Sequence, residues 1–206
     1  TTFHEAWLDD FDQIPAFTEI ASGDDWLIAV GIEGQKIALY RCMTDGSGAY
    51  CGFDELPGEL QLGVPIELLN VLEVPTLAVR SVESNYPAIL TWSKDTEKWE
   101  VEALLEDSRK MTAMHIVRED EVVFRVGVGD NGLIFANYGD EFKTIWMMSE
   151  SEQYGYEFAD VTRMGDYVVA LGVDNKGRYV LAHAPASENV VDKDHWQIHP
   201  LGIYAD

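Results

Sequence analysis

The sequence predicts an all-β protein, and within that class a β-propeller of about four four-stranded antiparallel blades. Long helical patterns are scarce in the 206 residues, and short runs rich in Val, Ile, Leu, Tyr and Trp recur instead. Gly, Asp and Asn separate these runs about every ten residues, as is typical of strands joined by tight turns. The runs fall into four sets of four, which is the repeat that a propeller requires.

The four sets define the expected blades of one domain spanning residues 1–206. The blade boundaries lie approximately at residues 16–55, 66–105, 111–148 and 157–201. The first-strand anchors are spaced by 51, 45 and 45 residues, and they are Ile20, Val71, Ile116 and Val161. A four-stranded meander cannot cover both of its faces, so each blade is expected to bury itself against its neighbours around an axis. A β-sandwich is the alternative fold.

Turn sequences after the second strands support the repeat. Arg125–Val128 aligns with Ala170–Val173, and each is followed by a turn rich in Asp, Asn and Gly. Asn and Gly tolerate the positive φ angles of tight hairpins. An EF-hand loop needs further carboxylates and a distal Glu, which both turns lack. We therefore expect hairpins here and no calcium loops.

One hairpin carries a family resemblance. Trp92-Ser93-Lys94-Asp95-Thr96-Glu97-Lys98-Trp99 resembles a degenerate Asp-box hairpin, which recurs in the blades of sialidase-like and other BNR-type propellers. The segment is one residue short, and Glu97 stands where the family has Gly. The resemblance implies the propeller fold and no activity. A sialidase-like site also needs an arginine-bearing motif before the first blade, and no arginine precedes Arg41.

The closure of the ring is a separate question. Residues 3–8 are similar to an outer strand, with Trp7 in the place of Trp99, Trp146 and Trp196. This strand either closes the ring by completing the last blade, which would displace residues 195–201, or is the remnant of a fifth blade. If four blades do not close alone, a homo-oligomer would complete the ring. Outer-strand aromatic residues are expected to pack between blades rather than to stack on sugars.

The first strands supply the candidate binding residues. A polar residue precedes each anchor, and by the rotational symmetry of a propeller these residues would line the central channel: Glu19, Asn70, His115 and Asp160. Their oxygen and nitrogen atoms suit a cation. The alternative, which we favour, is a water-filled channel whose polar groups are satisfied by solvent. No other cofactor is expected.

The two cysteines flank a turn. Cys42 and Cys51 lie on either side of Asp45-Gly46-Ser47-Gly48, so a hairpin would place them opposite each other. A cross-strand disulfide fits this arrangement. One pair in 206 residues is not a disulfide framework, however, and we expect reduced, buried thiols.

Charge excludes two classes of partner. Asp and Glu number 37 against 14 Lys and Arg, which gives a net charge of −23. Nucleic acids and anionic membrane surfaces require clustered basic residues, so neither is an expected partner. The sequence contains no apolar run long enough to span a membrane and no secretory signal pattern. A cytoplasmic or virion-associated location is therefore expected.

The repeat without a catalytic motif favours a non-catalytic binding or assembly propeller. Its partner would be a protein or a second copy, as in a structural or receptor-contacting component of a phage or virus particle. The first alternative is a carbohydrate-binding lectin, and the second is a glycoside hydrolase or lyase. We assign no catalytic residue, because a carboxylate pair cannot be chosen among 37 acidic residues without geometry.

Overall fold

The computed structural model describes residues 16–44, 48–82, 86–104, 110–119, 122–138, 141–146 and 155–204. Within these ranges the strands form four antiparallel sheets, each with four strands in chain order. Blade 1 consists of β1 (Ala16–Ser22), β2 (Trp26–Glu33), β3 (Lys36–Thr44) and β4 (Ala49–Asp54). Blade 2 consists of β5 (Val64–Val71), β6 (Val74–Arg80), β7 (Pro87–Ser93) and β8 (Lys98–Leu104).

The second half of the chain repeats this pattern. Blade 3 consists of β9 (Met111–Glu119), β10 (Val122–Gly129), β11 (Leu133–Tyr138) and β12 (Glu141–Trp146). Blade 4 consists of β13 (Glu157–Met164), β14 (Tyr167–Val173), β15 (Arg178–Pro185) and β16 (Gln197–Tyr204). Short 3-10 turns occupy some connections: η2 (Gly58–Leu62), η3 (Asp130–Gly132), η4 (Glu188–Val191) and η5 (Lys193–His195).

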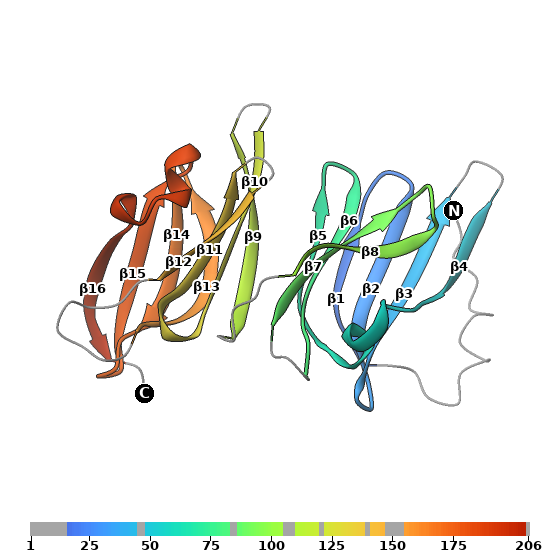
Figure 1. The fold of residues 1–206 in the computed structure, drawn as a ribbon, viewed down its shortest axis with the longest axis horizontal. Coiled ribbons are helices and arrows are strands. Elements are labelled where there is room, and N and C mark those ends of the chain that lie inside the picture. The colour runs from blue at the N-terminus through green and yellow to red at the C-terminus, as the bar shows by residue number, and fades with distance from the viewer. Residues whose placement is uncertain are drawn as a thin grey trace.

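The predicted all-β propeller architecture is confirmed. Blades 1 and 2 occupy one half of the molecule and blades 3 and 4 the other half (Figure 1). The first strands meet in the middle, because β1 packs against β5, β5 against β9, and β9 against β13. A sandwich would instead bury two larger sheets face to face. The first strands therefore carry the side chains that approach the centre of the molecule.

The core consists of clusters at the blade junctions. One cluster joins blades 1 and 2 around Ile28, Leu39 and Leu77. A second joins blades 2 and 3 around Ile89 and Phe135, and a third joins blades 3 and 4. Alternation along each strand directs every second side chain into one of these junctions. Among the residues that the structure describes, no such cluster joins blade 4 to blade 1.

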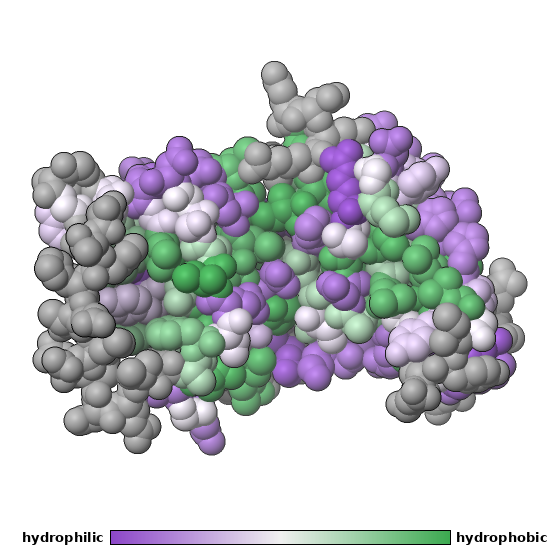
Figure 2. Space-filling model, turned by 180° about the vertical axis from the view of Figure 1, so that it is seen from behind, coloured by the Kyte–Doolittle hydropathy of each residue, from purple (hydrophilic) through white to green (hydrophobic). Residues whose placement is uncertain are grey.

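The two end blades expose apolar side chains on their outward faces. Ile20 on blade 1 is 67% exposed, and Met164 on blade 4 is 63% exposed. Tyr167 and Leu171 add to the exposed apolar surface of blade 4. Figure 2 shows hydrophobic residues in patches over both halves of the molecule, interrupted by hydrophilic ones. These faces are compatible with the expected homo-oligomer, which stays a prediction.

The structure also tests the expectations for closure and for the aromatic residues. The strand expected at residues 3–8, with Trp7, lies outside the described residues. β16 pairs with β15, so residues 197–204 are the fourth strand of the last blade and are not displaced. Trp99 and Trp196 are 3% and 5% exposed, which confirms that they pack in the core.

The turn at Asp174 is a hairpin, as expected. The Asp174 carboxylate accepts hydrogen bonds from the backbone N–H groups of Lys176 and Arg178. It also forms an ion pair with the Arg178 guanidinium. Gly177 adopts a φ of 73°, a conformation that glycine tolerates without strain. The carboxylate is therefore engaged by its own turn.

The expectation of reduced thiols is wrong. Cys42 and Cys51 are directly opposite each other on β3 and β4 and form a disulfide, with a Cα–Cα distance of 4.0 Å. The pairing register brings the two side chains to the same face of the sheet. The cross-strand disulfide was the alternative that the turn sequence allowed.

Replacing both Cys42 and Cys51 with alanine is expected to lower the free energy of unfolding by about 2–3 kcal/mol. The cross-link closes a short loop, with a sequence separation of 9 residues, and removes conformational entropy from the unfolded chain. Urea denaturation of the oxidised wild type, the reduced wild type and the double variant measures the effect. The last two should agree, and equal stability of the oxidised and reduced wild type would contradict the prediction.

Candidate functional site

The first strands of all four blades contain a β-bulge near their beginning. The pairing register shifts between Phe17 and Glu19 in β1, between Pro65 and Glu67 in β5, and between Phe158 and Asp160 in β13. In β9 the shift falls opposite Val128 and Gly129. A bulge turns the strand and changes the direction of the side chain that follows it. The bulges thus define equivalent positions in the four blades.

The first residue after each bulge is the equivalent position. These residues are spaced by 48, 46 and 47 positions, and they are Glu19, Glu67, Ala113 and Asp160. Glu19 and Asp160 thus occupy equivalent positions in the structure, and Glu67, which the sequence analysis did not name, occupies the equivalent position in blade 2. His115 lies two residues beyond Ala113, on the same face of β9.

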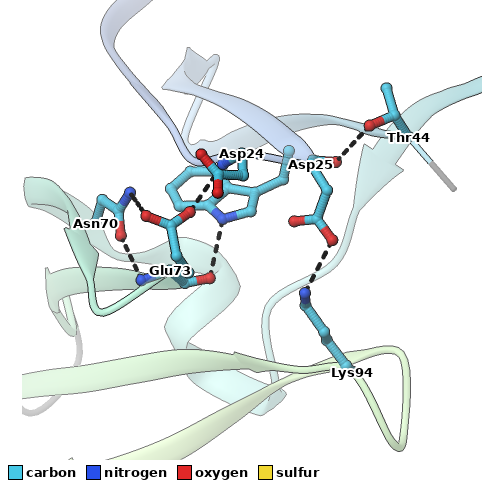
Figure 3. Close-up of polar contacts among 7 residues, drawn as sticks. Asp24, Asp25, Thr44, Asn70, Glu73 and Lys94 are labelled. Carbon is cyan, nitrogen blue, oxygen red and sulfur yellow. Dashed lines mark hydrogen bonds and ion pairs between the residues drawn. The ribbon is translucent and has the colours of Figure 1, made fainter. Parts of the chain in front are cut away.

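Asn70 does not belong to this set, which corrects its expected place. It lies at the end of β5 and pairs with Pro75 beside the hairpin to β6. Its side chain donates to the Ser22 carbonyl and accepts from the Glu73 N–H, both at 2.9 Å. Glu73 in turn accepts from the Asp24 N–H at 2.8 Å (Figure 3). Asn70 therefore joins the hairpin ends of blades 1 and 2.

Two of the carboxylates are fixed across blade junctions. Glu19 Oε2 accepts a hydrogen bond of 2.7 Å from the backbone N–H of Leu68 in blade 2. Glu67 accepts one from the backbone N–H of Met114 in blade 3. Each carboxylate thus reaches the first strand of the following blade. Backbone donors of this kind hold a carboxylate in place without neutralising it.

The acidic side chains influence one another electrostatically. Burial of Glu67, together with the negative charges of Glu19 and Asp160, raises its pKa from 4.5 to about 7. Burial also raises the pKa of Glu19, and the hydrogen bond from Leu68 partly offsets this effect. Burial lowers the pKa of His115, whereas the charge of Asp160 opposes that change. Glu19, Glu67, His115 and Asp160 therefore form one electrostatically linked group at the centre of the molecule.

Glu67 differs from an ordinary carboxyl group in its protonation state. A carboxyl group with a pKa of about 7 keeps its proton across mildly acidic pH, and Glu67 is half-buried. Asp160 is solvent-exposed. A carboxyl group that keeps its proton can act as the acid in bond cleavage, and a second, exposed carboxyl group can act as the base. The group is thus suited to acid–base chemistry.

A central cation was the less favoured interpretation of the channel residues. Among the described residues, no group of three or more His, Cys, Asp or Glu side chains is arranged to hold a metal ion.

A search for membrane-spanning helices in the described part of the chain finds none of sufficient length and hydropathy.

Comparison with known proteins identifies similar folds. No protein-family model matches the chain, and no curated protein sequence matches it. An α-L-arabinofuranosidase from Lactobacillus brevis has a similar structure, with a TM-score of 0.50 and 10% identity over 87% of this chain and 70% of that chain. A GH43 endo-arabinanase from Bacillus licheniformis has a TM-score of 0.44 and 15% identity over 82% and 71% of the two chains. At these identities the likeness concerns the fold.

These comparisons correct two expectations from the sequence. The resemblance to sialidase-like blades holds only at the level of the propeller fold, because the similar Lactobacillus brevis structure is an arabinofuranosidase. The expectation of a non-catalytic binding or assembly propeller, as in a phage or virus particle, is corrected by the same comparison. The glycoside hydrolase that was the second alternative fits the comparisons better.

Replacing Glu67 with glutamine is expected to make the protein less sensitive to alkaline pH. The pKa of Glu67 is higher in the folded protein than its ordinary value of 4.5, so its contribution to stability is complete below pH 4.5 and is lost as the pH rises towards 7. The variant has no carboxyl group at this position and does not lose this stability. Its free energy of unfolding should exceed that of the wild type by about 1 kcal/mol at pH 8, after allowance for solvent screening at a half-exposed site.

Urea denaturation at pH 4.5 and pH 8 measures the difference between the variant and the wild type. Glu33→Gln, which removes an exposed carboxyl group at the β2–β3 turn, is the matched control for the loss of one acidic side chain. A stability difference for Glu67→Gln that is the same at both pH values would contradict the raised pKa.

Proposed function

We propose that this protein hydrolyses glycosidic bonds at the group formed by Glu19, Glu67 and Asp160. The observation that carries the proposal is the raised pKa of Glu67 beside two further carboxyl groups. Glycoside hydrolases commonly use one protonated and one ionised carboxyl group on either side of the bond to be cleaved. The fold supports this reading, since the Lactobacillus brevis protein that it resembles is an arabinofuranosidase.

Each carboxyl group has a role that follows from its surroundings. Glu67 donates its proton to the leaving-group oxygen as the glycosidic bond breaks. Asp160, which is exposed, accepts a proton from the water that attacks the anomeric carbon. Glu19 is fixed by the Leu68 N–H, and its negative charge helps Glu67 to retain its proton. Exchange with solvent then returns the proton from Asp160 to Glu67.

The electrostatics also indicate the substrate class. Three acidic side chains surround the proposed site, and the chain carries a net charge of −23. A negative field of this size repels uronic and sialic acids and does not disfavour neutral sugars. Neutral pentosides, including α-L-arabinofuranosides, are therefore the substrates we propose.

A panel of aryl glycosides and neutral oligosaccharides tests the proposal. We expect the wild type to hydrolyse an unactivated arabinofuranoside or a related neutral pentoside, whose leaving group needs a proton, and Glu67→Gln to do so about 10²–10⁴-fold more slowly. Equal rates for the wild type and the variant on this unactivated substrate would point to a contaminating enzyme. Inactivity of the wild type over the whole panel, or binding of a glycan without cleavage, would overturn the proposal.

A further inference from the structure

Two histidines face each other on blade 4, outside the proposed active site. The Nε2 atoms of His183 and His199 are 3.0 Å apart. Their rings are nearly parallel, with 7° between the planes and 5.0 Å between the centroids. His183 lies opposite Gln197, and Leu181 lies opposite His199, so the histidines are diagonal neighbours on β15 and β16. Asp160 lies on β13, at the opposite edge of the same sheet.

The surroundings hold one ring and leave the other accessible. Tyr167 packs edge-on against His183, with 5.2 Å between the ring centroids. His183 is partly buried, whereas His199 is exposed to solvent. The two nitrogens therefore meet at the surface, where an ion can reach them, and rotation of the His199 ring is unobstructed by burial. Little conformational freedom is lost when both nitrogens bind one ion, because they are already close together.

The spacing of the nitrogens matches two neighbouring positions around a metal ion. An imidazole nitrogen binds a transition metal at about 2.0–2.1 Å. With the nitrogens 3.0 Å apart and both bound at that metal–nitrogen distance, the N–metal–N angle would be about 95°. That angle is close to the ~90° of square-planar coordination and smaller than the ~109° of a tetrahedral site.

We propose that His183 and His199 form a binding site for a divalent transition metal with square-planar preference, namely Cu(II). Water completes the coordination. Imidazole ligands suit copper, nickel and zinc, and the intrinsic order of affinity for such ligands places Cu(II) above both Ni(II) and Zn(II). The near-right-angle geometry strengthens this preference over Zn(II), which is usually tetrahedral in proteins.

One feature of the pair limits its affinity. The Nδ1 atom of His183 is buried and has no hydrogen-bond partner among the described residues. A metal-bound histidine normally donates its second N–H to a carboxylate or carbonyl, and loss of that partner weakens binding about 10–100-fold. The site is therefore expected to bind Cu(II) reversibly.

Cu(II) titration followed by calorimetry and electron paramagnetic resonance tests the site. All proteins carry His4→Gln, so that this histidine, which lies outside the described residues, cannot contribute to copper binding. We expect one Cu(II) per chain with two nitrogen ligands, and at least 10-fold weaker binding in His183→Gln and in His199→Gln. His195→Gln, an exposed histidine beside Asp192, is the control and should bind Cu(II) as the parent protein does.

The copper site can be tested even if one variant is unstable. If His183→Gln fails to fold, the exposed His199→Gln variant provides the test, with its circular dichroism spectrum as the check on folding. Unchanged affinity and nitrogen ligation in His199→Gln would overturn the proposal, as would tighter binding of Zn(II) than of Cu(II). Glycoside hydrolysis is not needed for this measurement, so the result is independent of the proposed function.

Discussion

Glu67→Gln is expected to reduce the rate of hydrolysis of an unactivated neutral pentoside by 10²–10⁴-fold. This range is the usual contribution of a general acid. Glutamine keeps the size of the side chain and lacks the transferable proton. The hydrogen bond from the Met114 N–H to the side-chain oxygen at this position can also be retained. The loss should therefore appear in kcat more than in KM.

The leaving group distinguishes loss of the acid from general damage to the site. A dinitrophenyl glycoside has a leaving group that departs without a proton, so the Glu67→Gln variant should cleave it at a rate close to that of the wild type. The pH–rate profile of the wild type should fall above about pH 7, where Glu67 loses its proton. Equal losses on activated and unactivated substrates would contradict the assignment of Glu67 as the acid.

Asp160→Asn supplies the matched comparison. Asp160 is proposed to activate the attacking water, which every substrate requires. Its replacement should slow hydrolysis of both substrates to the same degree, whereas Glu67→Gln should not. If Asp160→Asn spares activity on both substrates, Glu19 is the base instead, and Glu19→Gln should then show the uniform loss.

The blades were predictable because their signals are local. Strand runs and glycine-containing turns lie within about ten residues of each other, and each sheet consists of four strands that follow one another in the chain. Hairpin pairing needs only the turn and the alternation of the strands. The packing of Trp99 and Trp196 follows from the same alternation.

The site was only partly predictable, because a β-bulge shifts the alignment by amounts that residue spacing does not reveal. Aligning the apolar residues Ile20 and Val71 placed Asn70 beside Glu19. The observed register instead makes Leu68 the counterpart of Ile20 and Glu67 the counterpart of Glu19. A signal was present: Glu67 is the only acidic residue of β5. The rise in its pKa depends on burial and on charges from blades 1 and 4, and only the folded structure brings these about.

The disulfide and the histidine pair show the same limit in another way. Cys42 and Cys51 were predicted to face each other, but their number in the chain favoured the wrong oxidation state. His183 and His199 are separated by a long connection that contains η4 and η5, so neither spacing nor strand alternation predicts that their rings meet.

Phe158→Ala is expected to lower the free energy of unfolding by about 3–5 kcal/mol, the usual range for a buried phenylalanine. Phe158 is the second residue of β13, is 1% exposed, and packs into the cluster that joins blades 3 and 4. Its carbonyl also accepts a hydrogen bond of 2.6 Å from the Thr112 hydroxyl in blade 3. Loss of the ring leaves a cavity at the junction, two residues before Asp160.

Urea denaturation measures the stability, and Phe53→Ala is the matched control. Phe53 lies on the outward side of blade 1 and is 43% exposed, so its replacement should cost about 1 kcal/mol or less. Because the bulge between Phe158 and Asp160 sets the direction of the Asp160 side chain, Phe158→Ala should also slow hydrolysis under conditions where the variant remains folded. Equal losses of stability in the two variants would mean that the junction of blades 3 and 4 does not hold the propeller together. A stable but inactive Phe158→Ala protein would show that this junction serves mainly to position Asp160.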